Sequence, residues 1–141
     1  KADDRFDVRL HYPAFTATLK ASMLCRIPGP TYLIHGTKGS YVKYGLDVQE
    51  ENLDKGAIPN TKDWGREPES IWGTLHTEIE GIKIQGKIES ENGDYREFFI
   101  NLRDAIWGKA ELAVKPEEAR NVIRIIELAF QSNKEKRTLE V

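Results

Sequence analysis

The sequence predicts an α+β domain built on a mostly antiparallel open sheet, with helices packed on one face and the other face available for dimerisation. Two observations carry this prediction: short alternating apolar and polar segments separated by Gly- and Pro-rich turns fill the chain to residue 89, and two segments with helical apolar spacing follow. Runs of strands followed by runs of helices are typical of α+β architecture. With 141 residues the chain has room for one core, so we expect residues 1–141 to form a single domain.

The individual elements follow from local patterns. Alternation and turn residues predict strands at 6–12, 15–25, 31–35, 41–44, 73–79, 83–89 and 138–141. Apolar spacing of three and four predicts helices at 95–107 and 115–131, with Pro116 in the first turn of the second. A short helix at 46–55 would turn Leu46 and Leu53 inward. An apolar sheet face left uncovered would exceed what monomers usually expose, so we expect a second subunit or another domain to cover it.

Composition limits the class of partner. The formal net charge is −2, which gives no electrostatic reason to expect a nucleic acid or an anionic membrane. No apolar stretch approaches the roughly 20 residues that span a bilayer. Cys25 has no partner for a disulfide and stands in an apolar run, so we expect a small buried side chain and a reducing, cytoplasmic compartment. The chain starts at Lys1 without an initiator Met, and we expect it to be part of a longer protein.

Small motifs give no catalytic set. The glycines of segment 36–39 suit a hairpin turn between two strands, with anion binding as the alternative. His11, His35 and His76 lie far apart in strands, without the spacing of a zinc site, and read as structural or surface histidines. Glu67 and Glu69 flank Pro68, but a carboxylate pair would need a separation that sequence does not define. We therefore assign no catalytic and no metal-binding residue.

The segment 45–73 is the most function-like part of the chain. It is long, carries two prolines beyond its short predicted helix, and such loops inside a domain are often functional. Tryptophan rings beside an arginine suit the recognition of sugars and polyols, where a ring face and bidentate donors act together. The candidate substrate-binding residues are Tyr44, Trp64, Arg66 and Trp72. The alternative is that the two tryptophans only pin the loop to the body of the domain.

Several motifs recur together in the order of a known family. The run YLIHGTKGSYVKYGLD at 32–47, the run WGREP at 64–68 and the later segments 95–106 and 114–126 closely resemble the C-terminal domain of the Gfo/Idh/MocA oxidoreductases. This family includes glucose–fructose oxidoreductase and inositol dehydrogenase. The resemblance covers essentially the whole chain, and its most specific part is the Gly-Thr-Lys-Gly-Ser hairpin followed by Tyr44-Gly45.

The resemblance implies a two-domain NAD(P)-dependent oxidoreductase acting on a sugar, a polyol or a related compound. NAD or NADP would be bound by an N-terminal Rossmann domain that is absent here, so no cofactor-binding residue is assigned to this chain. The catalytic lysine, aspartate and histidine of the family also belong to parts that do not appear in the sequence. This chain would wall the substrate cleft, contact its own N-terminal domain and pair subunits into a homodimer or homotetramer, and would be inactive alone.

Two other functions are also compatible with the sequence. One is a stand-alone, non-catalytic dimerisation or interaction domain. The other is a small hydrolase that uses His76 or His35 with acidic residues of the loop. The sequence upstream of Lys1 would separate the first from the oxidoreductase, because only the oxidoreductase requires a Gly-x-Gly-x-x-Gly strand–helix unit there.

Overall fold

The computed structural model describes residues 3–141 as two compact units. One unit is continuous and spans residues 29–111. The other combines the N-terminal residues up to 28 with residues 112–141.

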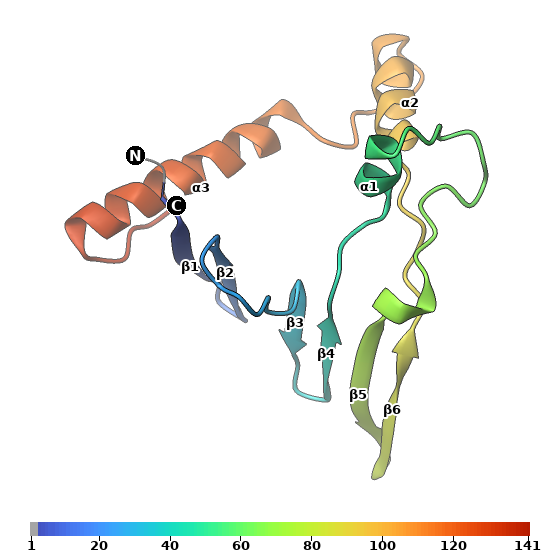
Figure 1. Ribbon diagram of the computed structural model, residues 1–141. Helices are drawn as coiled ribbons and strands as arrows, with labels where there is room; N and C mark the ends of the chain where they lie inside the picture. Colours follow the sequence, from blue (N-terminus) through green and yellow to red (C-terminus); the bar gives the residue numbers. More distant parts are fainter. Residues whose placement is uncertain (1–2) are drawn as a thin grey trace. The chain divides into compact units, whose positions relative to one another are not determined.

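The continuous unit is built on a four-stranded antiparallel sheet in the order β3-β4-β5-β6 (Figure 1). Its strands are β3 Tyr32–His35, β4 Gly39–Lys43, β5 Gly73–Ile79 and β6 Ile82–Ile88. The amide of Gly36 donates to the carbonyl of Gly39 at 2.8 Å and closes the hairpin that was predicted at 36–39. Glu80 and Gly81 both have positive φ, as a two-residue hairpin turn between β5 and β6 requires. The open antiparallel sheet and the helices confirm the α+β class.

The register of the four strands separates an apolar face from a polar face. Directly paired residues share a face, and adjacent rows alternate. One row joins Ile34, Tyr41 and Leu75, and the next joins His35, Ser40, His76 and Gln85. His35 Nδ1 and Ser40 Oγ are 2.9 Å apart within that polar row. These two rows present aliphatic and aromatic side chains on one side of the sheet and hydrogen-bonding side chains on the other, where Leu33 and Val42 also lie.

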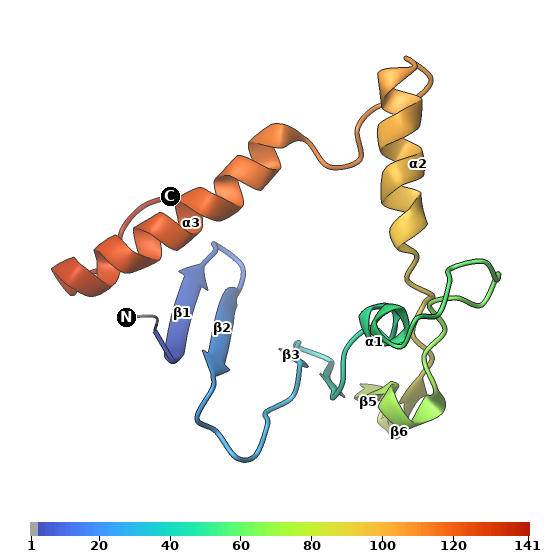
Figure 2. The same ribbon diagram turned by 45° about the horizontal axis from the view of Figure 1, so that its top comes forward.

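Two helices and one short 3₁₀ turn complete this unit. They are α1 Gln49–Asp54, the 3₁₀ turn Glu69–Ile71 and α2 Tyr95–Ile106. Figures 1 and 2 both show α1 beside the N-terminal end of α2. The predicted inward direction of Leu46 and Leu53 is wrong, because both are exposed, whereas Gln49 is fully buried. The helix forms around a polar contact rather than an apolar one.

The second unit contains a two-stranded antiparallel sheet and a long helix. These elements are β1 Arg5–His11, β2 Thr16–Ser22 and α3 Pro116–Glu135. The α3 helix continues beyond the apolar stripe through the polar residues 131–135, and its C-cap Lys136 adopts a left-handed conformation with φ 56°. An open groove of about 520 Å³ lies between β1 and the C-terminal part of α3, lined by Val8, Leu10, Leu128 and Leu139 among others.

Two sequence predictions in this unit are wrong. Residues 138–141 were expected to form a strand, but they pair with no strand in the described chain, and Leu139 instead lines the groove. Cys25 was expected to be buried, but it is exposed, because it follows the end of β2 and precedes the break at Pro28. Neither alternation over four residues nor a few apolar neighbours determines which distant segment a residue packs against.

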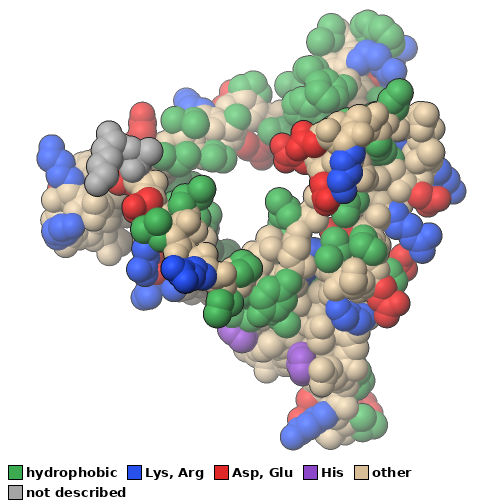
Figure 3. Space-filling view, in the orientation of Figure 1, with side chains coloured by type: hydrophobic (Ala, Val, Ile, Leu, Met, Phe, Trp, Pro, Cys, Tyr) green, Lys and Arg blue, Asp and Glu red, His purple; other side chains and the backbone are tan. Residues whose placement is uncertain are grey.

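Large apolar side chains are exposed on both units (Figure 3). On the four-stranded sheet they include Ile34, Ile79 and Ile82, and on α2 they include Phe98 and Phe99. Exposed apolar surfaces of this kind are candidates for contact with another domain or chain. None of the helices in the described part of the chain is long and apolar enough to cross a membrane.

Candidate functional site

The candidate site lies at one end of the four-stranded sheet. Tyr44 follows β4, Trp72 precedes β5 and Glu89 follows β6. Because these neighbouring strands are antiparallel, the end of β4, the start of β5 and the end of β6 lie at the same end of the sheet. We call the segment 44–72, which leaves β4 and returns to β5, the β4–β5 loop.

The structure brings three of the four predicted site residues to this end. The Tyr44 side chain is exposed, and the Arg66 guanidinium is exposed and contacts the Glu89 carboxylate at 3.2 Å. Trp72 is half-buried, and its indole N–H donates to the carbonyl oxygen of Glu67 at 3.1 Å. A phenol, a guanidinium and an indole therefore share one end of the sheet.

Trp64 stands apart from these three residues because its side chain is only 8% exposed. The neighbouring Gly65 is also buried, and a Cβ there would lie 1.8 Å from the carbonyl oxygen of Gly93. The loop thus packs directly against the backbone that leads into α2. This position is the one expected of a residue that anchors the loop.

A buried lysine connects the β4–β5 loop to the sheet. Lys43, at the end of β4, forms an ion pair with Glu67, and the two side chains are only 9% and 8% exposed. The ammonium also donates to the carbonyl of Ile71 and to the hydroxyl of Ser90, both at 3.1 Å. An ammonium has three donors, so each of them has a partner. We call Lys43, Glu67 and Ser90 the lysine hub.

The lysine hub keeps Glu67 ionised. Burial opposes ionisation of this carboxyl, but hydrogen bonds from Lys43 and Ser90 and the positive charge of Lys43 outweigh burial and lower the pKa of Glu67 below its ordinary 4.5. The nearby charge of Asp47 acts in the opposite direction. Glu67 is therefore the negative member of a buried ion pair at neutral pH, and it is not a free carboxylate.

A second polar contact fixes the other end of the loop. The fully buried Gln49 side chain donates to Asp47 at 2.8 Å and accepts from the backbone N–H of Tyr95 at 2.9 Å. That N–H belongs to the first turn of α2, where backbone donors have no partner within the helix. Gln49 therefore joins α1 to the start of α2.

Arg96 holds the middle of the loop. Its guanidinium donates to the carbonyl oxygens of Pro59 and Thr61 at 2.7 and 3.2 Å and to the Asp94 carboxylate at 2.6 Å. Asp94 in turn accepts from the Arg96 backbone N–H and begins α2. The hydrogen bond from Arg96 is the main cause that lowers the pKa of Asp94.

Sequence reasoning missed Lys43 and Gln49. One signal for Lys43 was present, because alternation in β4 places it on the same face as Tyr41, and a lysine on an apolar face needs a buried anion. Gln49 has no comparable signal, since a polar residue in a short helix normally faces water. Its role depends on a contact with Tyr95, which is 46 positions away.

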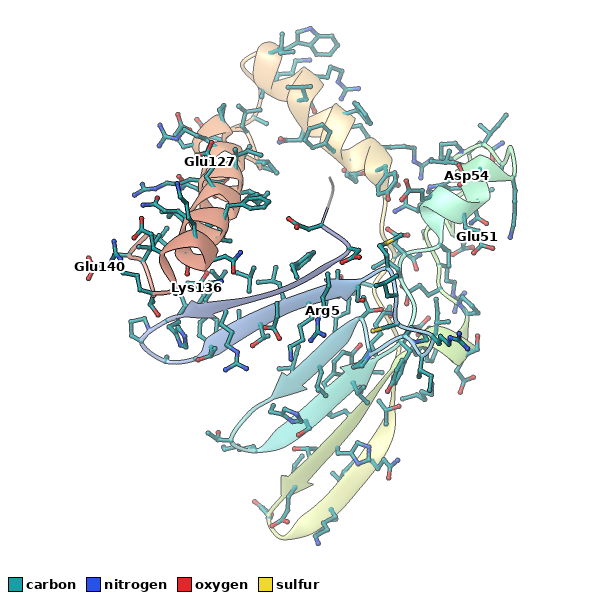
Figure 4. The ribbon with its side chains drawn as sticks, turned by 60° about the vertical axis from the view of Figure 1, so that its left-hand side comes forward. Arg5, Glu51, Asp54, Glu127, Lys136 and Glu140 are labelled. Carbon is teal, nitrogen blue, oxygen red and sulfur yellow. The ribbon has the colours of Figure 1, made fainter. Side chains whose placement is uncertain are left out.

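The acidic side chains of α1 and the histidines of the strands are exposed. Glu51 and Asp54, labelled on α1 in Figure 4, are exposed, and Glu51 pairs with Lys55 at 2.6 Å. Among residues 3–141, no three His, Cys, Asp or Glu side chains are placed to hold one metal ion. His35 and His76 lie in the exposed polar row of the sheet.

The strand pattern does not fit a dinucleotide site. Such sites place the pyrophosphate at a Gly-rich turn between a parallel strand and a helix. Here the strand pairs of the described residues are antiparallel, and the glycines of segment 36–39 lie in a hairpin. The fold and the site thus define an antiparallel sheet domain with aromatic and charged side chains gathered at one end.

Comparison with known proteins agrees with this class. The sequence model described as "Oxidoreductase family, C-terminal alpha/beta domain", of the Gfo/Idh/MocA type, matches residues 1–141. The scyllo-inositol 2-dehydrogenase (NADP(+)) IolW of Bacillus subtilis is 39% identical over 96% of this chain. The uncharacterized oxidoreductase YdgJ of Escherichia coli is 36% identical over 99% of this chain.

Solved structures show the same fold. The structure of YvaA from Bacillus subtilis matches 98% of this chain with a TM-score of 0.93 and 38% identity, and a Bacteroides fragilis protein matches all of it with a TM-score of 0.92 and 42% identity. The chain belongs to the Gfo/Idh/MocA oxidoreductase family and corresponds to its C-terminal domain. It spans about two fifths of its relatives: 38% of IolW, 40% of YdgJ, and 41% and 43% of the two solved chains.

Proposed function

We propose that this chain is the substrate-side domain of an NAD(P)-dependent oxidoreductase that interconverts a hydroxyl and a carbonyl group on a sugar, a polyol or a related compound. The observation that carries the proposal is the 39% identity with an NADP(+)-dependent scyllo-inositol 2-dehydrogenase over 96% of the chain. The cofactor and the catalytic groups belong to a separate N-terminal domain. Residues 1–141 form one functional unit with that domain and are inactive without it.

The exposed end of the sheet supports a role in polyol binding. Tyr44 and the Trp72 ring offer apolar surface of the kind that covers the C–H face of a polyol, and Arg66 offers paired N–H donors to hydroxyl oxygens. Trp64 belongs to the same loop and, as a buried side chain, would hold the loop in place. In this proposal Tyr44, Trp64, Arg66 and Trp72 form the substrate-side wall.

The decisive experiment uses the full-length protein. NADP⁺ or NAD⁺ is mixed with scyllo-inositol and a panel of other inositols and sugars, and reduced nicotinamide is followed at 340 nm. We expect turnover with at least one polyol and none with residues 1–141 alone. Turnover by the 141-residue chain, or none by the full-length protein with any compound of the panel, would reject the proposal.

The site assignment has its own test. Arg66→Ala in the full-length enzyme removes the donors, and we expect the substrate KM to rise while the KM for NADP⁺ stays the same. Lys83→Ala, an exposed cation on β6 away from the site end of the sheet, is the matched control. Equal substrate KM values in the two variants would remove Arg66 from the site.

In this proposal the protein is cytoplasmic and associates through its open sheet into a homodimer or homotetramer. Exposed Ile34, Ile79 and Ile82 on the apolar rows form a surface that a second subunit or the N-terminal domain can cover. Sedimentation of the full-length protein measures the oligomeric state. A monomer at high micromolar concentration would contradict this part of the proposal.

A further inference from the structure

The lysine hub joins three segments that are distant in the sequence. From Lys43, Glu67 lies 24 positions along the chain, Ile71 lies 28 and Ser90 lies 47. One ammonium therefore connects β4 to two points of the β4–β5 loop and to the segment that follows β6. Both charged side chains are more than nine-tenths buried, so neither serves as a solvent-facing charge.

Glu67 connects Lys43 to the candidate site residues. Its carboxylate binds Lys43, and its carbonyl oxygen accepts the indole N–H of Trp72. Arg66 precedes it in the chain, and Tyr44 follows Lys43. Lys43 and Glu67 are therefore linked to all three residues at the end of the sheet, to Tyr44 and Arg66 as chain neighbours and to Trp72 by a hydrogen bond.

Stability alone gives a weak reason for such a pair. A buried ion pair can usually be replaced by apolar side chains of similar volume without loss of stability, whereas removal of one partner leaves an uncompensated charge. The charges do add direction, because a carboxylate and three ammonium donors fix angles that apolar side chains leave free. The function that the pair serves is therefore geometric.

We propose that Lys43 is a positioning residue that, through Glu67, sets the placement of Trp72 and Arg66 at the substrate-side wall. The role in turnover rests on the proposed function, but the placement of Trp72 does not. Lys43 itself touches neither substrate nor cofactor in this proposal. It acts only through the loop that it holds.

The test is a double replacement that keeps the volume and removes the charges. Lys43→Met/Glu67→Met is made in the full-length protein, and Lys55→Met/Glu51→Met is the matched control at an exposed ion pair. Urea unfolding establishes that both variants are folded. The readouts are kcat and KM for scyllo-inositol, the KM for NADP⁺, and the indole N–H resonance of Trp72, which is assigned by its loss in Trp72→Phe.

We expect the buried double variant to shift the Trp72 resonance and to lose about 10- to 100-fold in kcat/KM for scyllo-inositol, as misplacement of a binding group does. The KM for NADP⁺ and the Trp107 resonance should not change, and the control variant should match the wild type. A buried double variant with wild-type kcat/KM and an unshifted Trp72 resonance would overturn the proposal. If the wild type oxidises no polyol, the proposed function fails, and the Trp72 resonance alone decides the positioning role.

Discussion

The close contact between Gly65 and Gly93 makes a sharp prediction about stability. A Cβ on residue 65 would lie 1.8 Å from the carbonyl oxygen of Gly93 and 2.7 Å from its carbonyl carbon. Both distances are far inside van der Waals contact, and the opposing atoms are backbone rather than a flexible side chain. Gly65→Ala therefore forces the β4–β5 loop and the segment before α2 apart.

The size of the effect follows from the rigidity of the two segments. Extra methyl groups in packed regions typically cost 1–3 kcal/mol, and we expect about 3 kcal/mol here because neither backbone has space to retreat. For a domain of this length, about 3 kcal/mol corresponds to a fall in Tm of roughly 10 °C. Separation of the segments also strains the contact between Gln49 and Tyr95, which lies beside Gly93.

Urea unfolding followed by circular dichroism measures this difference. Gly86→Ala is the control, because a Cβ at that position in β6 meets nothing within 4 Å and the residue does not need a positive φ. We expect the control to unfold within about 0.5 kcal/mol of the wild type. If Gly65→Ala and Gly86→Ala unfold at the same urea concentration, the close contact does not exist in solution and the reasoning is refuted.

Three further predictions concern the polar contacts that hold the loop. The folded-state pKa of Glu67 is lowered, so its contribution to the free energy of unfolding is present above pH 4.5 and is lost as the pH falls through the folded-state value. In urea unfolding across this range, the free energy of unfolding should fall less with acid for Glu67→Gln than for the wild type. Gln49→Leu leaves the N–H of Tyr95 buried without an acceptor and should cost about 1–3 kcal/mol in urea unfolding, and a cost below 0.5 kcal/mol would contradict the contact. Arg96→Lys keeps the charge but loses the fork that reaches the loop carbonyls, so amide exchange should accelerate in residues 56–63 and stay unchanged in β5.

The sheet could be predicted from the sequence because its signals are local. Alternation with period 2 and glycine-containing turns place β3, β4, β5 and β6 within one or two residues of their observed bounds. The same is true of α2, whose apolar spacing and Asp94 cap lie within a single segment. For these elements the local preference and the observed structure agree.

The interior of the site could not be predicted, because its contacts join distant residues. Tyr44, Arg66 and Trp72 were identified by residue type, and their gathering at one end of the sheet depends on the antiparallel pairing of β4, β5 and β6. Lys43 has the sequence pattern of an ordinary strand residue, because its partners Glu67 and Ser90 belong to distant segments. The strand predicted at 138–141 failed for a similar reason, since alternation cannot provide a pairing partner.

The long reach of the Lys43 contacts has a consequence for the order of folding. Its most distant partner, Ser90, is 47 residues away, and the contact can close only after β4, β5 and β6 have paired. Contacts of large sequence separation carry the cost of loop closure and form late. We therefore expect the β4–β5 loop to be the last part of its unit to assemble and the first to open on warming. Opening of this loop should then precede loss of the sheet, at a temperature where circular dichroism still reports a folded protein.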